Sequence, residues 1–366
     1  MAQLNRKDII EAHSRLTASV TKTPCILSLD LSAQLQEQLA DSATSVQVFS
    51  KLENLQIGGS FKYRGAMNAL SQLDVDELAK GIVTYSSGNH ARGLLEVAHV
   101  VSRLKQVEIP LHVVMPEQAA AEKRRAVQDL GAHLYQEPGY GLEACARRAQ
   151  RIAEETGARL VASSDDADVI SGHGTITLEF LRQVQEYEEL HQGHSQLGEV
   201  GTGALDVLLV PCGGGGLLAG CLVALEGTET LVLACEPVAG GGSQLLESLR
   251  QGRQVPRDER AGPSAADGLR SEIGDASWAI ISERMTERDV IQVSEEQITA
   301  ALEVSQNLGL EGSVEPSSAV SLAALLYSSE LGKRMRYEGK KHLNVGIIIT
   351  GGNIGAAQQR PVESLR

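Results

Sequence analysis

A lysine at the start of a predicted helix is the first residue whose position suits chemistry. The helix is predicted over 60–73, with Ser60 as its N-cap and Lys62 in its first turn, inside the segment GGSFKYRGA (58–66). The positive end of the helix dipole disfavours an ammonium group there and so favours the neutral amine. A neutral amine can attack a carbonyl carbon and form an imine. Taken alone, the segment fits an ordinary surface lysine equally well.

A second group of polar residues follows the predicted strand 81–86. Its sequence is Ser86-Ser87-Gly88-Asn89-His90-Ala91. Hydroxyls, an amide and backbone N–H groups at the carboxyl end of a parallel strand can together bind an anion. The Ser87 hydroxyl can also move a proton. The alternative is a capped helix start with Ser87 or Asn89 as the N-cap, and the two interpretations are compatible.

Four consecutive glycines, Gly213, Gly214, Gly215 and Gly216, lie between a predicted strand and a predicted helix. Because they carry no side chains, their backbone amides can converge on a phosphate group. No Lys-Ser/Thr pair follows, so the run does not indicate a nucleoside-triphosphate hydrolase. Close packing of the helix on the strand is the alternative explanation for the glycines.

The same loop leaves a dinucleotide site open as an interpretation. In the looser GxGxxA pattern, Gly214, Gly216 and Ala219 match, and Glu236 ends the next predicted strand. A nicotinamide oxidoreductase would, however, leave the segments around Lys62, Ser87 and Thr350 without a role.

The last predicted strand also ends in a hydroxyl. Thr350-Gly351-Gly352-Asn353 directly follows the apolar run VGIII (345–349). The carboxyl end of a strand is where α/β sheets bind their ligands, so Thr350 is a candidate ligand contact. The alternative is a turn with a helix cap.

Strand-like and helix-like segments alternate along most of the chain. Strands are predicted at 46–53, 81–86, 110–116, 133–137, 159–163, 206–211, 230–237 and 343–350, and helices at 5–20, 60–73, 121–131 and 141–157. Such alternation is typical of a parallel α/β sheet. Continuous apolar strands such as the last one indicate a sheet covered on both faces.

Composition argues against two classes of partner. With 33 basic and 47 acidic side chains the formal charge is −14, so the basic surface of a nucleic-acid binder and the polybasic patch of a membrane-surface protein are both missing. The uncharged stretch 207–225 approaches membrane-spanning length, but Pro211 and the four glycines would break a lipid-exposed helix. Five scattered cysteines and an N-terminus without an apolar leader predict a cytoplasmic protein with free thiols.

Taken together, the four segments resemble the fold-type II pyridoxal-phosphate enzymes, specifically the serine racemase and serine/threonine dehydratase family, which includes 3-hydroxyaspartate dehydratases. The resemblance covers nearly the whole chain in order and spacing, and it extends to GHGT (172–175), CEP (235–237), ADG (266–268) and EPS (315–317). It implies an α/β, tryptophan-synthase-β-like fold with two open parallel-sheet domains. Residues 1–80 and 165–366 would form a large cofactor-binding domain and 81–164 a small mobile one, in a homodimer.

The resemblance also implies a role for each candidate residue. Lys62 would carry the pyridoxal 5'-phosphate, with Phe61 beside the ring, Asn89 bonded to the 3-oxygen and Thr350 facing the pyridine nitrogen. The backbone of Gly213, Gly214, Gly215, Gly216 and Leu217 would bind the phosphate. The substrate carboxylate would be held by Ser86, Ser87, Asn89 and His90.

The implied reaction starts when Lys62 removes the Cα proton of an amino acid. Loss of hydroxide from Cβ would then give an aminoacrylate, which water hydrolyses to a keto acid and ammonia. Return of a proton by Ser87 from the opposite face would instead give the enantiomer. Simple threonine dehydratases of this family usually have alanine at the position of Ser87, which favours the racemase-like branch. We therefore expect an ammonia-lyase and/or racemase acting on serine, threonine or 3-hydroxyaspartate. The alternatives are a β-replacement enzyme, a racemase of another amino acid such as aspartate, and a non-catalytic cofactor binder.

Some residues depart from the family pattern. The family's divalent cation (Mg, Ca or Mn) would use Glu236 and an acid six residues later, but that position is Gly242, so one negative ligand is missing and we expect no tight metal dependence. The segment ASSDD (162–166) and Glu143 also differ from the usual residues, which favours an unusual substrate.

Overall fold

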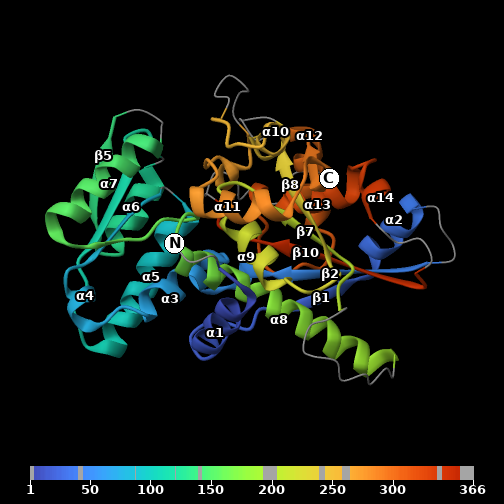
Figure 1. Cartoon of the computed structure of the whole chain (residues 1–366), viewed down its shortest axis with the longest axis horizontal. Coiled ribbons are helices and arrows are strands. Elements are labelled where there is room, and N and C mark those ends of the chain that lie inside the picture. Colours follow the sequence, from blue (N-terminus) through green and yellow to red (C-terminus); the bar gives the residue numbers. More distant parts are fainter. Residues whose placement is uncertain are drawn as a thin grey trace, which may run out of the picture.

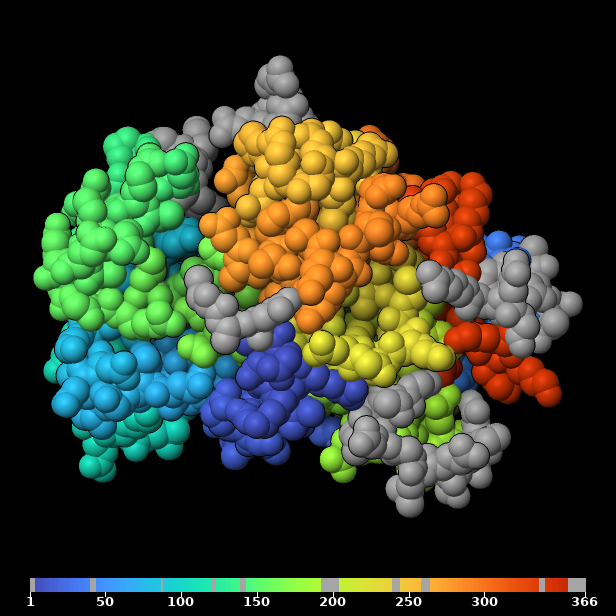
Figure 2. Space-filling model, viewed as in Figure 1, coloured from blue at the N-terminus to red at the C-terminus, as the bar shows by residue number. Residues whose placement is uncertain are grey.

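Two separate β-sheets organise the chain. The computed structural model describes residues 4–39, 44–86, 88–119, 121–138, 142–192, 204–238, 244–257, 264–335 and 340–354. A six-stranded sheet has the order β1-β2-β10-β7-β8-β9, and a four-stranded sheet has the order β5-β4-β3-β6. Figure 1 shows them as two lobes side by side, and in Figure 2 the cyan and green residues of the smaller sheet form the lobe at the left.

The large sheet collects strands from both halves of the chain. Its members are β1 (Cys25–Ser28), β2 (Ser45–Leu52), β7 (Val207–Pro211), β8 (Leu231–Pro237), β9 (Val290–Val293) and β10 (His342–Ile349). Every pairing is parallel except that of β1, which lies antiparallel to β2 at the edge. The sheet is therefore mixed at one edge and parallel throughout its centre, as is common for α/β proteins.

Apolar side chains cover both faces of the large sheet. Along β7, Leu208 and Val210 join the core under helices α8 (Ala167–Gln192) and α9 (Gly216–Ala224), while Val207 and Leu209 join the core on the other face. That second core includes α2 (Leu29–Leu39), α12 (Glu295–Ser305) and α13 (Pro316–Tyr327). The prediction that continuous apolar strands belong to a doubly covered sheet is confirmed.

The small sheet is parallel throughout. It contains β3 (Ile82–Tyr85), β4 (Leu111–Pro116), β5 (His133–Glu137) and β6 (Arg159–Leu160), connected by α5 (Asn89–Lys105), α6 (Ala121–Asp129) and α7 (Leu142–Thr156). One of its cores also contains Tyr63, Met67 and Leu70 of α3 (Lys62–Ser71). Helix α3 thus packs against the small sheet as well as against α8 of the large part.

The remaining helices pack around the two sheets. They are α1 (Arg6–Leu16), α4 (Val75–Ala79), α10 (Gln244–Gln251), α11 (Asp275–Arg284) and α14 (Leu331–Arg334). Two strands, β1 and β9, are absent from the sequence prediction, β6 ends at Leu160 rather than at 163, and the helix predicted at 5–20 ends at Leu16. Both missed strands have four residues, too few for a clear alternating pattern.

The predicted N-cap of the lysine helix is wrong. Helix α3 begins at Lys62 with Phe61 at the N-cap position and no capping side chain. Ser60 instead forms an isolated bridge with Gly351, and its hydroxyl is buried without a hydrogen-bond partner among the described residues. The backbone of Ser60 is extended, as in a strand, and pairs with Gly351. This pairing outweighs the local preference of serine for the N-cap position.

Among the described residues, no helix is long and apolar enough to cross a membrane. The uncharged stretch 207–225 forms β7, the glycine loop and α9, all packed inside the large part of the molecule. This stretch is apolar because it is buried in the protein core rather than in a membrane.

Glycines bring three helices into direct backbone contact. A Cβ added to Gly220 of α9 would lie 2.6 Å from the carbonyl oxygen of Ile170 and 2.7 Å from the backbone nitrogen of Gly174, both on α8. A Cβ on Gly172 would lie 2.6 Å from the carbonyl oxygen of Arg64 on α3. The motif GHGT thus serves, at least, to pack α8 tightly between α3 and α9.

Replacing Gly220 by alanine should destabilise the protein, because the methyl group meets backbone atoms that cannot rotate away. We expect a loss of about 1–3 kcal/mol in the free energy of unfolding, measured by denaturant titration. Leu190→Ala is the control on α8, since Leu190 is 82% exposed and should change stability by less than about 0.5 kcal/mol. Equal stability of Gly220→Ala and wild type would contradict the packing analysis.

Candidate active site

Three of the predicted segments lie at one edge of the large sheet. Strands β2, β10 and β7 are adjacent and parallel, and their carboxyl ends lead to Lys62, Thr350 and the glycine loop respectively. The fourth segment, Ser86–Ala91, follows β3 of the small sheet. The carboxyl edges of open parallel sheets are where ligands bind, and here two such edges face each other.

The amine of Lys62 lies at the centre of this arrangement. It donates a hydrogen bond to the carbonyl oxygen of Ser163 (2.8 Å) and lies 4.8 Å from the centre of the Phe61 ring. Burial lowers its pKa to about 8, and the negative charge of Glu315 opposes part of that shift. A depressed amine pKa was expected from the helix dipole, but its main physical cause in the structure is desolvation.

The loop after β10 runs beside the loop that precedes Lys62. The N–H of Phe61 donates to the carbonyl oxygen of Thr350 (3.0 Å), and the N–H of Gly352 donates to that of Gly59 (3.0 Å). Thr350 is buried, and its hydroxyl lies 2.9 Å from that of Ser318. The candidate lysine and the candidate threonine are therefore held together by backbone hydrogen bonds.

The glycine loop is enclosed so tightly that no side chain would fit. A Cβ on Gly214 would lie 2.3 Å from Oγ of Ser164, and one on Gly216 would lie 2.8 Å from Cα of the same serine. Gly215 has a φ of +85°, in the left-handed region that favours glycine. Because Ser163 contacts the Lys62 amine and Ser164 contacts the loop, the amine and the loop are close neighbours.

The first amides of α9 are not used by the helix itself. The N–H of Ala219 makes the first bond of α9, to the carbonyl oxygen of Gly215. The N–H groups of Gly216, Leu217 and Leu218 therefore have no carbonyl within the helix to bond. Together with the dipole of α9, N–H groups of this kind can bind an anion such as phosphate.

Asn89, at the start of α5, is held by residues from the large part. Its amide nitrogen donates to both oxygens of Glu315 (2.8 and 3.0 Å), and its amide oxygen accepts from Asn353 (2.9 Å). Burial raises the pKa of Glu315 to about 7, and the bond from Asn89 opposes that shift. Glu315 was noticed only as part of the motif EPS, and its role at the site was missed.

Two buried histidines flank the site in the neutral form. Nε2 of His90 lies 3.1 Å from the carbonyl oxygen of Val161, and burial lowers the pKa of His90 to about 3. His173 packs against the Phe61 ring with their centres 4.7 Å apart, and burial holds its pKa well below the usual value. The His90 side chain is thus bonded to the protein backbone. The group of His90 that can bind a ligand is its backbone N–H, in the first turn of α5.

The structure describes Ser86 and the segment 162–166 but not Ser87. The Ser86 hydroxyl accepts from the N–H of Gly88 (3.2 Å). Ser87 lies outside the described residues. No carboxylate of the described segment 162–166 contacts the Lys62 amine; only the carbonyl of Ser163 does.

Glu236, on β8, joins its strand to two neighbouring elements, α10 and β9. Its carboxylate accepts from the backbone N–H groups of Leu245 (3.0 Å) and Leu246 (3.2 Å) in α10 and from the side chain of Gln292 (3.1 Å). Burial raises its pKa to about 7. Both oxygens are engaged, which weakens the dinucleotide interpretation. No group of three metal-ligating side chains occurs in the described part of the chain, and Gly242 lies outside it.

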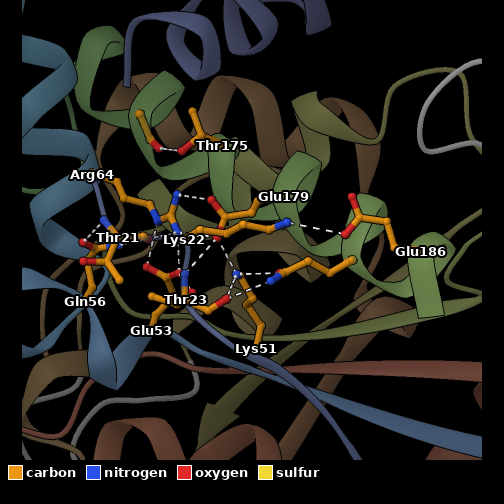
Figure 3. Close-up of polar contacts among 12 residues, drawn as sticks. Thr21, Lys22, Thr23, Lys51, Glu53, Gln56, Arg64, Thr175, Glu179 and Glu186 are labelled. Carbon is orange, nitrogen blue, oxygen red and sulfur yellow. Dashed lines mark hydrogen bonds and ion pairs between the residues drawn. The ribbon is translucent and has the colours of Figure 1, made fainter. Parts of the chain in front are cut away.

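A buried ion network joins the lysine helix α3 to neighbouring segments (Figure 3). Sequence reasoning missed this network. Arg64, two residues after Lys62, makes paired hydrogen bonds to Glu53 (2.8 and 2.9 Å) and to Glu179 (2.9 and 3.2 Å). Lys51 adds a 2.5 Å contact to Glu179. Arg64, Lys51 and Glu53 are fully buried. These charged residues come from three separate segments of the chain, so no local sequence pattern indicated that they would be buried together.

Arg64→Met should destabilise the protein strongly, because Glu53 and Glu179 would be left as buried carboxylates with less compensation. We expect a loss of about 3–5 kcal/mol in the free energy of unfolding, measured by denaturant titration. The matched control is Lys22→Met, which removes an exposed pair with Glu186 (3.4 Å) and should cost at most about 1 kcal/mol. Similar costs for the two variants would show that the network does not stabilise α3.

Comparison with known proteins agrees with this geometry. The family described as "Pyridoxal-phosphate dependent enzyme" matches residues 16–351. A serine racemase of Oryza sativa subsp. indica is 34% identical over 94% of this chain and 90% of its own. An L-threo-3-hydroxyaspartate ammonia-lyase of Saccharomyces cerevisiae is 33% identical over 95% of this chain and 92% of its own.

Solved structures give the same result. The structure of maize serine racemase superimposes with a TM-score of 0.78 at 31% identity, covering 98% of this chain and 95% of that one. The fold expected from the resemblance is confirmed as fold-type II, and the four segments that carried the resemblance converge in space. With a family match across residues 16–351 and relatives of this similarity over nearly its full length, the chain belongs to the pyridoxal-phosphate-dependent enzyme family.

Proposed function

We propose that this chain is an ammonia-lyase and/or racemase that acts on a small hydroxy amino acid, namely serine, threonine or 3-hydroxyaspartate. The observation that carries the proposal is the Lys62 amine, buried and with a pKa of about 8, beside a glycine loop that opens a helix. The relatives named serine racemase and 3-hydroxyaspartate ammonia-lyase supply the substrate class. Each of them is similar over nearly its whole length, which supports the transfer.

The residues present fit pyridoxal 5'-phosphate. An amine with a pKa lowered to about 8 suits attachment of an aldehyde, and the amides of Gly213, Gly214, Gly215, Gly216 and Leu217 suit a phosphate. The enclosed glycines would exclude any larger residue from this loop. Phe61 would lie beside the ring, Asn89 would meet the 3-oxygen and Thr350 would face the ring nitrogen.

The bound cofactor supplies an electron sink that makes the Cα–H bond of an amino acid acidic. The N–H groups at the start of α5, at Asn89 and His90, together with Ser86 and Ser87, would hold the substrate carboxylate. Lys62, once displaced from the cofactor, would remove the Cα proton from one face. Ser87 would donate or accept a proton on the other face.

A second role for Lys62 follows from its position. An amine that has given up its bond to the cofactor remains close to the reacting carbon because α3 holds it there. Its lowered pKa makes it a base that is partly neutral near pH 8. Elimination of water needs only this base, whereas inversion needs Ser87 as well. The two outcomes therefore depend on different residues.

Domain movement, assembly and location complete the proposal. Residues 81–164 would move as a small domain against 1–80 and 165–366, and closure would exclude water from the site. We expect a homodimer in the cytoplasm, and the five free cysteines support a reducing compartment. Glu236 already accepts three hydrogen bonds, which supports activity without a tightly bound Mg, Ca or Mn ion.

The first test is chemical attachment. Borohydride reduction of the cofactor-loaded protein, followed by peptide mapping, should place the pyridoxyl group on Lys62, and Lys62→Ala should lose both the adduct and all turnover. A pyridoxyl group on another lysine would overturn the proposal. Keto acid and chiral inversion would be followed with a panel of L- and D-amino acids. Capture of an added thiol in place of keto-acid release would identify a β-replacement enzyme, and inversion of aspartate alone would identify an aspartate racemase.

The second test uses pH. Because the neutral amine reacts with the aldehyde, the rate at which the apoprotein takes up the cofactor should rise with pH and level off above about 8. Glu315→Gln should move this midpoint lower, since Glu315 raises the pKa of Lys62. The pH dependence would be read from stopped-flow absorbance. A midpoint near the ordinary value of 10.5 would show that the amine is not desolvated.

The third test separates the two faces of the substrate. Ser87→Ala should reduce inversion of L-serine at least about tenfold, the usual size of a general-acid contribution, and elimination from the L-substrate much less. Chiral chromatography and a keto-acid assay measure the two rates. Equal loss of both would refute the assignment of Ser87 to the second face.

A further inference from the structure

The side-chain amide of Asn353 joins three segments around the site. Its Nδ2 donates to the carbonyl oxygen of Gly58 (2.8 Å) and to Oδ1 of Asn89 (2.9 Å), and its Oδ1 accepts from Arg92 (3.0 Å). Gly58 precedes the lysine helix α3, and Asn353 follows β10. Asn89 and Arg92 lie in the first turn of α5. Both hydrogens of the Asn353 amide are therefore used within the protein.

These partners allow only one orientation of the Asn353 amide. The Gly58 carbonyl can only accept and the Arg92 guanidinium can only donate, so the nitrogen of Asn353 must face Gly58 and its oxygen must face Arg92. The same nitrogen also faces Asn89, so the Asn89 amide has to present its oxygen there. A reversed Asn89 amide would set two N–H donors against each other. The nitrogen of Asn89 is thereby turned to the opposite side.

On that side, Glu315 uses only one hydrogen of the Asn89 amide. Nδ2 of Asn89 lies 2.8 and 3.0 Å from the two oxygens of Glu315. Seen from this nitrogen, the two hydrogens of an amide diverge more widely than the two oxygens of one carboxylate, so both oxygens share one hydrogen. In the described part of the chain, Nδ2 of Asn89 donates to no other group. Its second hydrogen can therefore bond an acceptor on a ligand.

We infer that Asn353 is a positioning residue that holds the Asn89 amide with its nitrogen, rather than its oxygen, toward the 3-oxygen of the cofactor. This inference rests on the proposed function, in which Asn89 meets that oxygen. An ionised 3-oxygen is stabilised by an N–H donor, whereas a carbonyl oxygen in the same place would repel it. The two orientations of an amide have nearly the same shape, so packing alone does not choose between them. The hydrogen bonds of Asn353 make the choice.

The test is the absorbance of the cofactor-loaded protein. The cofactor absorbs at longer wavelength when its 3-oxygen is ionised than when that oxygen is protonated, so the ratio of the two bands reports how well the ionised form is stabilised. In Asn353→Ala this ratio, measured at one fixed pH, should fall about threefold to tenfold, as expected for the loss of one hydrogen bond. The fall is expected because the Asn89 amide is no longer held with its N–H on the 3-oxygen.

Two further proteins separate positioning from general damage. In Asn89→Ala the ratio should already be low, and adding Asn353→Ala should lower it no further, because Asn353 acts through Asn89. Asn54→Ala is the matched control. The Asn54 amide likewise donates to two backbone carbonyls, those of Glu311 (2.8 Å) and Ser313 (3.1 Å), but neither bond involves Asn89. This variant should leave the ratio unchanged.

Specific results would overturn the inference. One is an unchanged ratio in Asn353→Ala, and another is a further fall when Asn353→Ala is added to Asn89→Ala. If Asn353→Ala does not fold, Arg92→Met, which changes an exposed side chain, should lower the ratio by a smaller factor, and no change there would overturn the inference as well. Failure of the proposed function gives a different result, because no pyridoxyl group would then be found on Lys62.

Discussion

The buried ion network around Arg64 is the interaction on which the rest of the site depends. Arg64 fixes α3 to the turn directly after β2 through Glu53 and to α8 through Glu179, and Lys62 stands less than one helical turn before it. A side chain as long as lysine can point in many directions, so its amine is placed only if its backbone is placed first. Four charge-assisted bonds from one planar guanidinium give that backbone a fixed position.

Close helix packing completes the same frame. The glycines of α8 and α9 let α8 pack with its backbone in contact with both α3 and α9. The start of α9 is therefore fixed relative to the start of α3 through α8. In the proposed function, the amides that would bind the phosphate lie at the start of α9, and the amine that would carry the cofactor lies at the start of α3. A cofactor that spans them would be held at two points, by a covalent bond and by an anion site. This division explains why helix ends, rather than loops alone, form the site.

The sequence was informative where local chemistry decides the structure. The glycine run, the Thr350 hydroxyl after an apolar strand and the polar segment after β3 all lie where strand ends predict them, because parallel strands deliver their carboxyl ends to one edge. Three central strands of the large sheet, β7, β8 and β10, also followed from nearly continuous apolar runs. Recognition of the family added residue roles that spacing alone did not contain.

What the sequence did not reveal depends on contacts between distant segments. Arg64 pairs with Glu179, which is 115 residues away, and Asn89 pairs with Glu315, which is 226 residues away. Ser60 looked like a helix cap but bridges Gly351 instead. His90 looked like a ligand side chain but bonds the carbonyl of Val161. In each case a tertiary partner outweighed a local preference, and nothing near the residue in sequence signals that partner.

The central claim is that the Lys62 amine and the glycine loop hold opposite ends of one pyridoxal phosphate. A crystal structure of the cofactor-loaded protein tests it most directly. The account predicts continuous density from Nζ of Lys62 to the cofactor, with phosphate oxygens within hydrogen-bond distance of the amides of Gly214 to Leu217. Density for the phosphate at any other helix start, or an unmodified Lys62 that still donates to Ser163, would contradict it.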